Sequence, residues 1–170
     1  KECEEYIEEA KIKVLENLFI PMQDGTRLAA KIWLPESAEQ NPVPAILEYI
    51  PYRKRDFKAV RDDQIHGYFA ERGYAGVRVD LRGSGDSEGV LRDEYLQQEL
   101  DDGVEVIRWL ASRSWCTGDV GMIGISWGGF NGLQIASMQP PGLTAIITVA
   151  SSDDRYADDV HYMGGNLLTD

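Results

Sequence analysis

Hydrophobic residues recur along this chain at two spacings, which predict strands and helices in alternation. Short runs of apolar and β-branched residues are typical of strands, whereas apolar positions three and four residues apart indicate a helix packed on a sheet. In the expected long helix, Leu100, Val104 and Ile107 share one face in this way. We expect strands at about 14–21, 27–34, 45–50, 74–80, 120–125 and 143–150, and helices at about 62–72, 94–112 and 129–138.

The order of these elements predicts an α/β fold. The segment 23–26 (QDGT) separates the first two strands, and its Asp-Gly pair is typical of a hairpin turn. From residue 45 onward strands alternate with helices, as in a parallel sheet that helices cover on both faces. We therefore expect a mostly parallel sheet with helices on both faces, led by one antiparallel hairpin.

Composition narrows the class of function. The 170 residues include 17 Lys and Arg against 29 Asp and Glu, which gives a net charge of −12. Nucleic-acid binding requires a basic face, so we expect no nucleic-acid partner. The apolar run at 145–150 is far shorter than a membrane span, so we expect no membrane partner either.

The cysteines and histidines show no disulfide or metal pattern. Cys3 and Cys116 lie far apart without C-x-x-C spacing, which favours free thiols, a buried Cys116 and a cytoplasmic location. His66 and His161 have no ligand-type spacing with each other or with the cysteines, so we expect no metal and no cofactor. His66 is expected to be a partly exposed residue of the helix at 62–72.

The segment 124–129 (GISWGG) is the strongest functional signal in the sequence. It joins an expected buried strand to an expected helix, and a serine on such a turn is lifted above the sheet, as in a nucleophile elbow. Residues two before and two after the serine must be small, as Gly124 and Gly128 are. We expect Ser126 to be the nucleophile, with the Trp127 backbone N–H stabilising an oxyanion at the helix N-terminus. The alternative is a Gly-rich turn with a capping serine.

Other segments support a serine hydrolase. Ser126 follows the fifth expected strand, which is the position of the nucleophile in the α/β-hydrolase fold. The chain resembles the X-prolyl dipeptidyl aminopeptidase and cocaine esterase group of that fold, in the order of the group, from about residue 13 to 160. The resemblance rests on 20–28 (IPMQDGTRL), 51–54 (PYRK), 79–89 (VDLRGSGDSEG) and 115–122 (WCTGDVGM) as well as the elbow.

The resemblance implies a chemistry and a second oxyanion donor. Members cleave an ester or amide bond of a small acyl or X-prolyl-type substrate through an acyl-serine intermediate. In this group a tyrosine hydroxyl after the third strand is an oxyanion donor, and Tyr52 falls at that place; the alternative is an ordinary loop aromatic. The partner expected from the resemblance is thus a small ester, amide or peptide substrate.

Two loops near these residues have competing interpretations. The glycines of the loop at 83–89 miss the dinucleotide-binding spacing by one residue, which disfavours a nucleotide site. The resemblance implies instead a structural loop, whose glycines allow tight turns beside the active site. Arg53, Lys54 and Arg55 are expected to form a solvated basic loop or to contact an anionic substrate end.

A serine nucleophile also needs a base and an orienting carboxylate. In the resembling group the acid and the base follow the seventh and eighth strands, and a helical cap follows the sixth. We therefore expect the acid and base to lie outside this chain, and the isolated chain to be inactive. The expected organisation is an acidic N-terminal tail at 1–12, the N-terminal part of an α/β-hydrolase domain at 13–152, and the start of a cap or linker at 153–170.

A compact triad within the chain is the alternative. Ser126, then Asp153 or Asp154, then His161 reproduces the chain order Ser–Asp–His. His161 follows the acid so closely, however, that it would have to fold back over Ser126 from a loop. A polar entry to the cap is the simpler interpretation of this segment.

The sixth strand raises the question of self-association. In the usual hydrolase strand order, 1-2-4-3-5-6-7-8, a chain with six strands leaves residues 143–150 as an uncharged apolar edge, which favours pairing with a second chain.

A non-catalytic, hydrolase-derived half-domain is the second functional hypothesis, because no base segment is recognised after residue 150. A nucleotide-binding module is the third.

Overall fold

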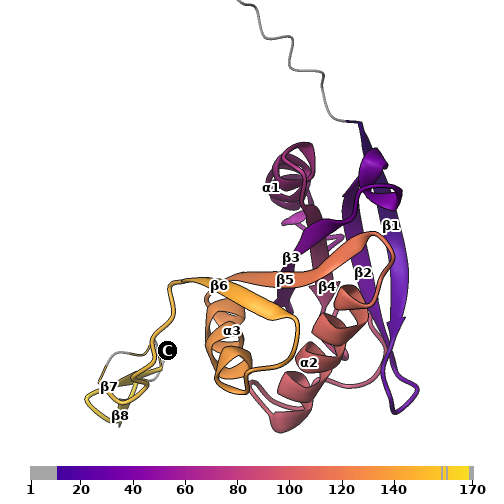
Figure 1. The fold of residues 1–170 in the computed structure, drawn as a ribbon. Helices are drawn as coiled ribbons and strands as arrows, with labels where there is room; N and C mark the ends of the chain where they lie inside the picture. The colour runs from indigo at the N-terminus through magenta and orange to yellow at the C-terminus, as the bar shows by residue number, and fades with distance from the viewer. Residues whose placement is uncertain (1–10, 158, 160, 169–170) are drawn as a thin grey trace, which may run out of the picture.

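The computed structural model describes residues 11–157, 159 and 161–168, which form one mixed six-stranded sheet with flanking helices (Figure 1). The strand order is β1-β2-β4-β3-β5-β6; β1, β2 and β4 pair antiparallel, and β4, β3, β5 and β6 pair parallel. This confirms the predicted fold and the order of the first six α/β-hydrolase strands. The strands are β1 (Ile12–Pro21), β2 (Arg27–Pro35), β3 (Val43–Ile50), β4 (Ala75–Asp80), β5 (Cys116–Ile125) and β6 (Leu143–Val149).

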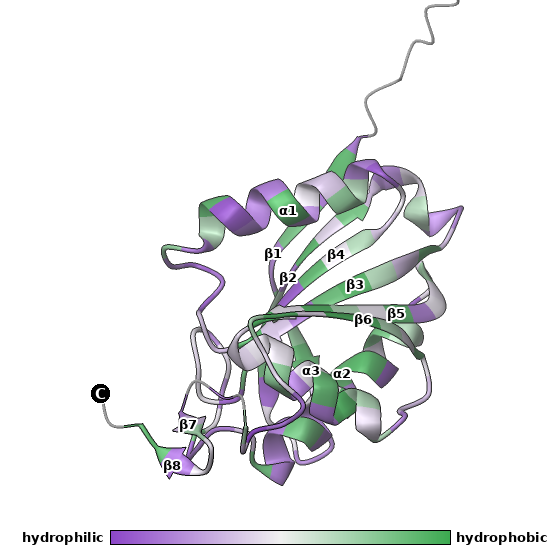
Figure 2. Ribbon diagram, turned by 90° about the vertical axis from the view of Figure 1, so that its left-hand side faces the viewer, coloured by the Kyte–Doolittle hydropathy of each residue, from purple (hydrophilic) through white to green (hydrophobic). Residues whose placement is uncertain are grey.

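Helices cover both faces of this sheet. Helix α1 (Ala59–Glu71) packs on β4 and β2 from one side, whereas α2 (Gln97–Ala111) and α3 (Trp127–Ser137) pack from the other (Figure 2). A short 3-10 helix, η1 (Glu36–Glu39), links β2 to β3. After β6 the chain forms a small hairpin of β7 (Tyr162–Met163) and β8 (Asn166–Leu167). None of the described helices combines the length and the apolar character needed to cross a bilayer.

The core lies between the central strands and α2. Leu47, Val77 and Val79 of β3 and β4 are fully buried, and Ile107 and Leu110 of α2 pack in the same cluster. These central strands are mainly hydrophobic (Figure 2), as expected of parallel strands buried on both faces. Cys116 is also buried, at 8% exposure, as predicted. Residues 1–10 of the predicted tail, including Cys3, lie outside the described residues.

Several predicted boundaries differ from the structure by a few residues, and two of these differences have a clear cause. Strand β5 begins at Cys116 rather than near 120, because Cys116 pairs with Val43 ahead of an irregularity in the β3–β5 ladder. Helix α2 begins at Gln97 rather than near 94, since Tyr95 has a φ of 57° and Leu96 is extended. Neither backbone conformation continues a helix.

Candidate active site

Ser126 lies on a sharp turn between β5 and α3. Its backbone has φ 55° and ψ −117°, a left-handed conformation that few residues besides glycine adopt. The Ser126 N–H donates to the Val149 carbonyl at 2.8 Å, and the Ser126 carbonyl accepts from the Gly129 N–H at 2.8 Å. The Ser126 side chain makes no capping hydrogen bond to α3, so it is not an ordinary helix cap. This is the strand–turn–helix geometry of a nucleophile elbow.

The glycines around Ser126 are required by close backbone contacts. A Cβ on Gly124 would lie 2.1 Å from the Gly128 carbonyl oxygen, where the turn brings the end of β5 against the start of α3. A Cβ on Gly128 would lie 3.2 Å from Cδ1 of Ile50, the last residue of β3. The elbow therefore packs directly against the end of β3.

Trp127 is the first residue of α3. The N–H groups of the first helical turn have no acceptor within the helix, and the helix dipole favours negative charge at this end. The Trp127 N–H is thus suited to donate a hydrogen bond to an oxyanion that develops beside Ser126.

Glu99 of α2 lies behind the elbow and was not singled out from the sequence. It is 5% exposed, and it accepts hydrogen bonds from Trp127 Nε1 at 2.9 Å, Asn131 Nδ2 at 3.0 Å and the Tyr95 N–H at 2.9 Å. Burial raises the pKa of Glu99, although these three hydrogen bonds oppose it. A carboxylate on a helix usually faces solvent, so the sequence carries no signal for this buried contact.

Tyr52 lies half-buried in the loop after β3. Burial raises the pKa of the Tyr95 hydroxyl, and the charges of Glu94 and Tyr52 add smaller contributions. The Tyr95 ring in turn packs on Trp127, with ring centroids 5.4 Å apart. Tyr52 follows the end of β3, whose last residue, Ile50, packs on Gly128 of the elbow.

The glycines of the loop at 83–89 have structural roles. Gly83, Gly85 and Gly89 all have positive φ, at 71°, 54° and 90°. A Cβ on Gly83 would lie 2.1 Å from the Leu91 backbone nitrogen, and a Cβ on Gly85 would lie 2.1 Å from Asp80 Oδ2. The loop thus folds tightly over the end of β4, as the sequence predicted for a structural loop.

The prediction of a solvated basic loop is correct for two residues and wrong for one. Arg53 and Arg55 are exposed, and each pairs with a nearby aspartate. Lys54 is 2% exposed, and its ammonium group contacts Asp80 and Asp86. Its burial is possible because the two carboxylates compensate the buried charge.

The segment after β6 places His161 beside a different aspartate from those predicted. His161 Nδ1 lies 3.1 Å from Asp159 Oδ1, and Nε2 lies 3.9 Å from Glu94 Oε1. Asp153 is exposed, and Asp154 accepts from the backbone N–H groups of Tyr156 and Ala157 in a local turn. Across the described residues, the structure shows no hydrogen bond between Ser126 and His161, so it does not assemble the compact triad.

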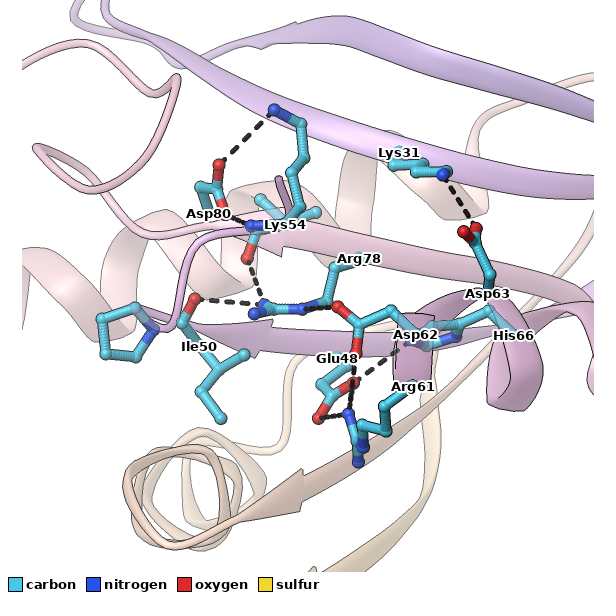
Figure 3. A network of polar contacts seen from close by, with 12 residues as sticks. Lys31, Glu48, Ile50, Lys54, Arg61, Asp62, Asp63, His66, Arg78 and Asp80 are labelled. Atoms are coloured by element: carbon cyan, nitrogen blue, oxygen red, sulfur yellow. Dashed lines mark hydrogen bonds and ion pairs between the residues drawn. The ribbon is translucent and has the colours of Figure 1, made fainter. Parts of the chain in front are cut away.

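A charged cluster under α1 was also missed, and the prediction for His66 is wrong. His66 is fully buried, stacks on Trp33 with centroids 4.9 Å apart, and lies with Nε2 3.2 Å from Glu48 Oε2 (Figure 3). The helix packs this face onto β2 and β4, where aromatic stacking and the Glu48 carboxylate accommodate an imidazole. A single histidine on a polar helix gives no sign of such a position.

The same cluster brings three possible metal ligands together. Single ligand atoms of Glu48, Asp62 and His66 lie within 4.8 Å of one another. Both carboxylates already bind arginines, since Arg61 contacts Glu48 and Asp62, and Arg78 Nε donates to Asp62 at 2.9 Å (Figure 3). Because two positively charged guanidinium groups already neutralise these carboxylates, a metal cation would bind there poorly. The cluster is better explained as a network of ion pairs between α1 and the sheet.

Sequence comparison identifies the family. The family model of X-Pro dipeptidyl-peptidase (S15 family) matches residues 24–170. The cocaine esterase of Rhodococcus sp. is 35% identical over 157 residues, which cover 91% of this chain and 26% of the esterase. A putative Xaa-Pro dipeptidyl-peptidase of Bacillus anthracis is 28% identical over 184 residues, covering 84% of this chain and 30% of that protein. The chain thus spans less than a third of the length of these relatives.

Solved structures agree with this assignment. A CocE/NonD family hydrolase from Staphylococcus aureus matches with a TM-score of 0.76 and 27% identity, over 92% of this chain and 31% of the hydrolase. An α-amino acid ester hydrolase matches with a TM-score of 0.71 and 28% identity, over 94% of this chain and 28% of that chain. On the family match, the elbow and the strand order, this chain belongs to the S15 family of X-Pro dipeptidyl-peptidases.

Proposed function

We propose that the protein is a serine hydrolase and that Ser126 is its nucleophile. The strained elbow at Ser126 is the observation that carries this proposal, because such a conformation costs about 1–3 kcal/mol and persists where function requires it. The Ser126 oxygen would attack the carbonyl carbon of an ester or amide, passing its proton to a base, and the alcohol or amine would leave. Water would then release the acid from the acyl-serine.

The Trp127 N–H and the Tyr52 hydroxyl are the proposed oxyanion donors. Trp127 is supported by its place at the N-terminus of α3, and Tyr52 by its place in the loop after β3, whose last residue packs on the elbow. Oxyanion donors act on charge that develops in the transition state, so they raise kcat more than they change KM.

The relatives indicate the substrate class. Their names describe a cocaine esterase, Xaa-Pro dipeptidyl-peptidases and an α-amino acid ester hydrolase. We accordingly propose an ester or amide of a small acyl group, or an X-prolyl peptide, as substrate. The base and its orienting acid are proposed to lie outside these 170 residues, which would leave the isolated chain inactive.

A fluorophosphonate probe tests the role of Ser126. In the protein expressed from its complete gene, we expect one covalent adduct by intact mass and none in Ser126→Ala. Ser137→Ala is the matched control, because Ser137 ends the same helix and its hydroxyl bonds the Gln134 carbonyl of that helix. Retained esterase turnover in Ser126→Ala would overturn the proposal.

The second hypothesis, a non-catalytic half-domain, is favoured by the pairing of His161 with Asp159 instead of with Ser126. The same probe applied to the isolated 170-residue chain separates the two. No adduct from the folded chain together with an adduct from the complete protein would support an enzyme whose base lies elsewhere. No adduct from either would support the half-domain.

A further inference from the structure

The backbone on both sides of Tyr52 is held by side chains of β4 and the loop that follows it. Arg78 Nη1 donates to the Ile50 carbonyl at 3.2 Å, and Ser84 Oγ donates to the Pro51 carbonyl at 2.7 Å. On the other side, the Lys54 N–H donates to Asp80 Oδ1 at 2.7 Å (Figure 3). Tyr52 therefore lies between two fixed points that are only three residues apart.

Asp80 is the centre of this arrangement. It is fully buried, and its Oδ2 accepts from the Asp86 N–H at 3.1 Å and lies 3.4 Å from Lys54 Nζ. Gly85 passes so close to Oδ2 that any Cβ there would overlap it. The Asp80 carboxylate thus joins the Tyr52 loop to the loop at 83–89.

Lys54 and Asp80 form a buried ion pair beside the strained backbone of Arg53. A buried ion pair adds little net stability relative to apolar packing. Arg53, the residue after Tyr52, has a φ of 52°, a strained conformation for a residue with a side chain. Such strain persists where neighbouring groups hold the backbone in place. Here the hydrogen bonds of the Pro51 carbonyl and the Lys54 N–H hold the backbone on both sides of Arg53.

We infer that Ser84 and Asp80 are positioning residues that fix the Tyr52 loop so that its hydroxyl can donate to the oxyanion. The inference rests on the proposed function. An oxyanion donor must lie within about 2.7–3.1 Å of the developing charge, and misplacement by about 1 Å can cost about 100-fold in rate. Ser84 and Asp80 would act through Tyr52 and would not touch the substrate.

Two serines of the same loop provide a matched test. Ser84→Ala removes the bond to the Pro51 carbonyl. Ser87→Ala removes a bond of the same 2.7 Å length to the Asp80 carbonyl, and also the bond that Ser87 Oγ accepts from the Ala29 N–H at 2.8 Å, so it is the more disruptive change of the two. In the protein expressed from its complete gene, with p-nitrophenyl acetate as substrate, we expect Ser84→Ala to lower kcat about 10-fold with little change in KM. Ser87→Ala should change kcat less than about twofold. Active sites are counted with a fluorophosphonate, so unfolded protein does not affect the comparison.

A double-mutant cycle with Tyr52→Phe shows whether Ser84 acts through the tyrosine hydroxyl. Tyr52→Phe alone should lower kcat about 100- to 1,000-fold. Adding Ser84→Ala or Asp80→Asn to Tyr52→Phe should then change kcat less than about twofold. Ser84→Thr, which keeps the hydroxyl donor, should restore kcat to nearly the wild-type value.

Several results would overturn the inference. These are equal kcat values for Ser84→Ala and Ser87→Ala, a 10-fold loss that persists in the Tyr52→Phe background, or full activity of Tyr52→Phe. The last result leaves the hydrolase proposal intact if Ser126→Ala is inactive. Active Ser126→Ala, in contrast, removes the proposed function and this inference together.

Discussion

At the scale of single residues, the elbow depends on close backbone contacts that are possible only because Gly124 and Gly128 have no Cβ. Ser126 takes a left-handed conformation with a side chain, so its neighbours must leave room for the turn. The contact of Gly124 with the Gly128 carbonyl, 2.1 Å from an added Cβ, is backbone against backbone. No rotation of a side chain can relieve such an overlap.

Substitution of Gly124 is therefore expected to be costly. Gly124→Ala should lower the free energy of unfolding by about 3 kcal/mol, because either β5 or α3 must shift. The control is Gly121→Ala in the same strand, where the nearest atom to an added Cβ is 3.8 Å away. Gly121→Ala should stay within about 1 kcal/mol of the wild type. Urea unfolding followed by tryptophan fluorescence measures both, and equal losses would contradict the explanation.

At the scale of elements, α1 is attached to the sheet by charge as well as by apolar contact. Its Asp62 and His66 are buried over β3 and β4, where they meet Glu48 and Arg78 (Figure 3). Burial raises the pKa of Glu48, but hydrogen bonds with His66 and Arg61 and the charge of Arg78 outweigh burial and lower it to about 2. The Glu48 carboxylate is thus stabilised in its charged form by the folded state.

This pKa predicts how stability depends on pH. Because the folded pKa of about 2 lies below the ordinary value of 4.5, Glu48 stabilises the fold above pH 4.5. That contribution, up to about 3 kcal/mol, is lost as the pH falls from 4.5 toward 2. Urea midpoints measured between about pH 6 and pH 3 should fall less steeply for Glu48→Gln than for the wild type. The exposed Glu71→Gln on the same helix should keep the wild-type slope, and a wild-type slope for Glu48→Gln would refute the prediction.

At the scale of the whole molecule, β6 forms one edge of the sheet. Among the described residues β6 pairs with β5 alone, and Ile147 and Val149 are 60% and 48% exposed. An exposed apolar edge strand can pair with another chain. We propose that the 170-residue chain self-associates through β6 in solution.

A lysine at this edge tests the proposal. Light scattering after size-exclusion chromatography should show a mass that rises with concentration for the wild-type chain and a monomer for Ile147→Lys. Val60→Lys is the control, because Val60 is 71% exposed on α1, away from β6. A wild-type chain that stays monomeric at all concentrations rules out this mode of association.

The sequence by itself determined the succession of strands and helices, the two-sided helical cover and the position of Ser126. Hydrophobic periodicity is a local property of each element, and the glycines at 124 and 128 mark the elbow by their spacing alone. The family resemblance added the strand order and Tyr52, whose hydroxyl role stays a prediction. The periodicity and the glycine spacing of the elbow depend on neighbours along the chain, so they can be recognised without a fold.

Only the tertiary structure decided which charged residues are buried and which partners they have. Lys54 and His66 were expected near solvent, yet each is buried beside a carboxylate, Lys54 with Asp80 and His66 with Glu48. The partners lie 26 and 18 residues apart in sequence and meet because β3, β4 and α1 pack together. The sequence gives the sign of each charge. Whether a buried charge has a partner of opposite sign depends on which groups folding brings within a few ångströms of it.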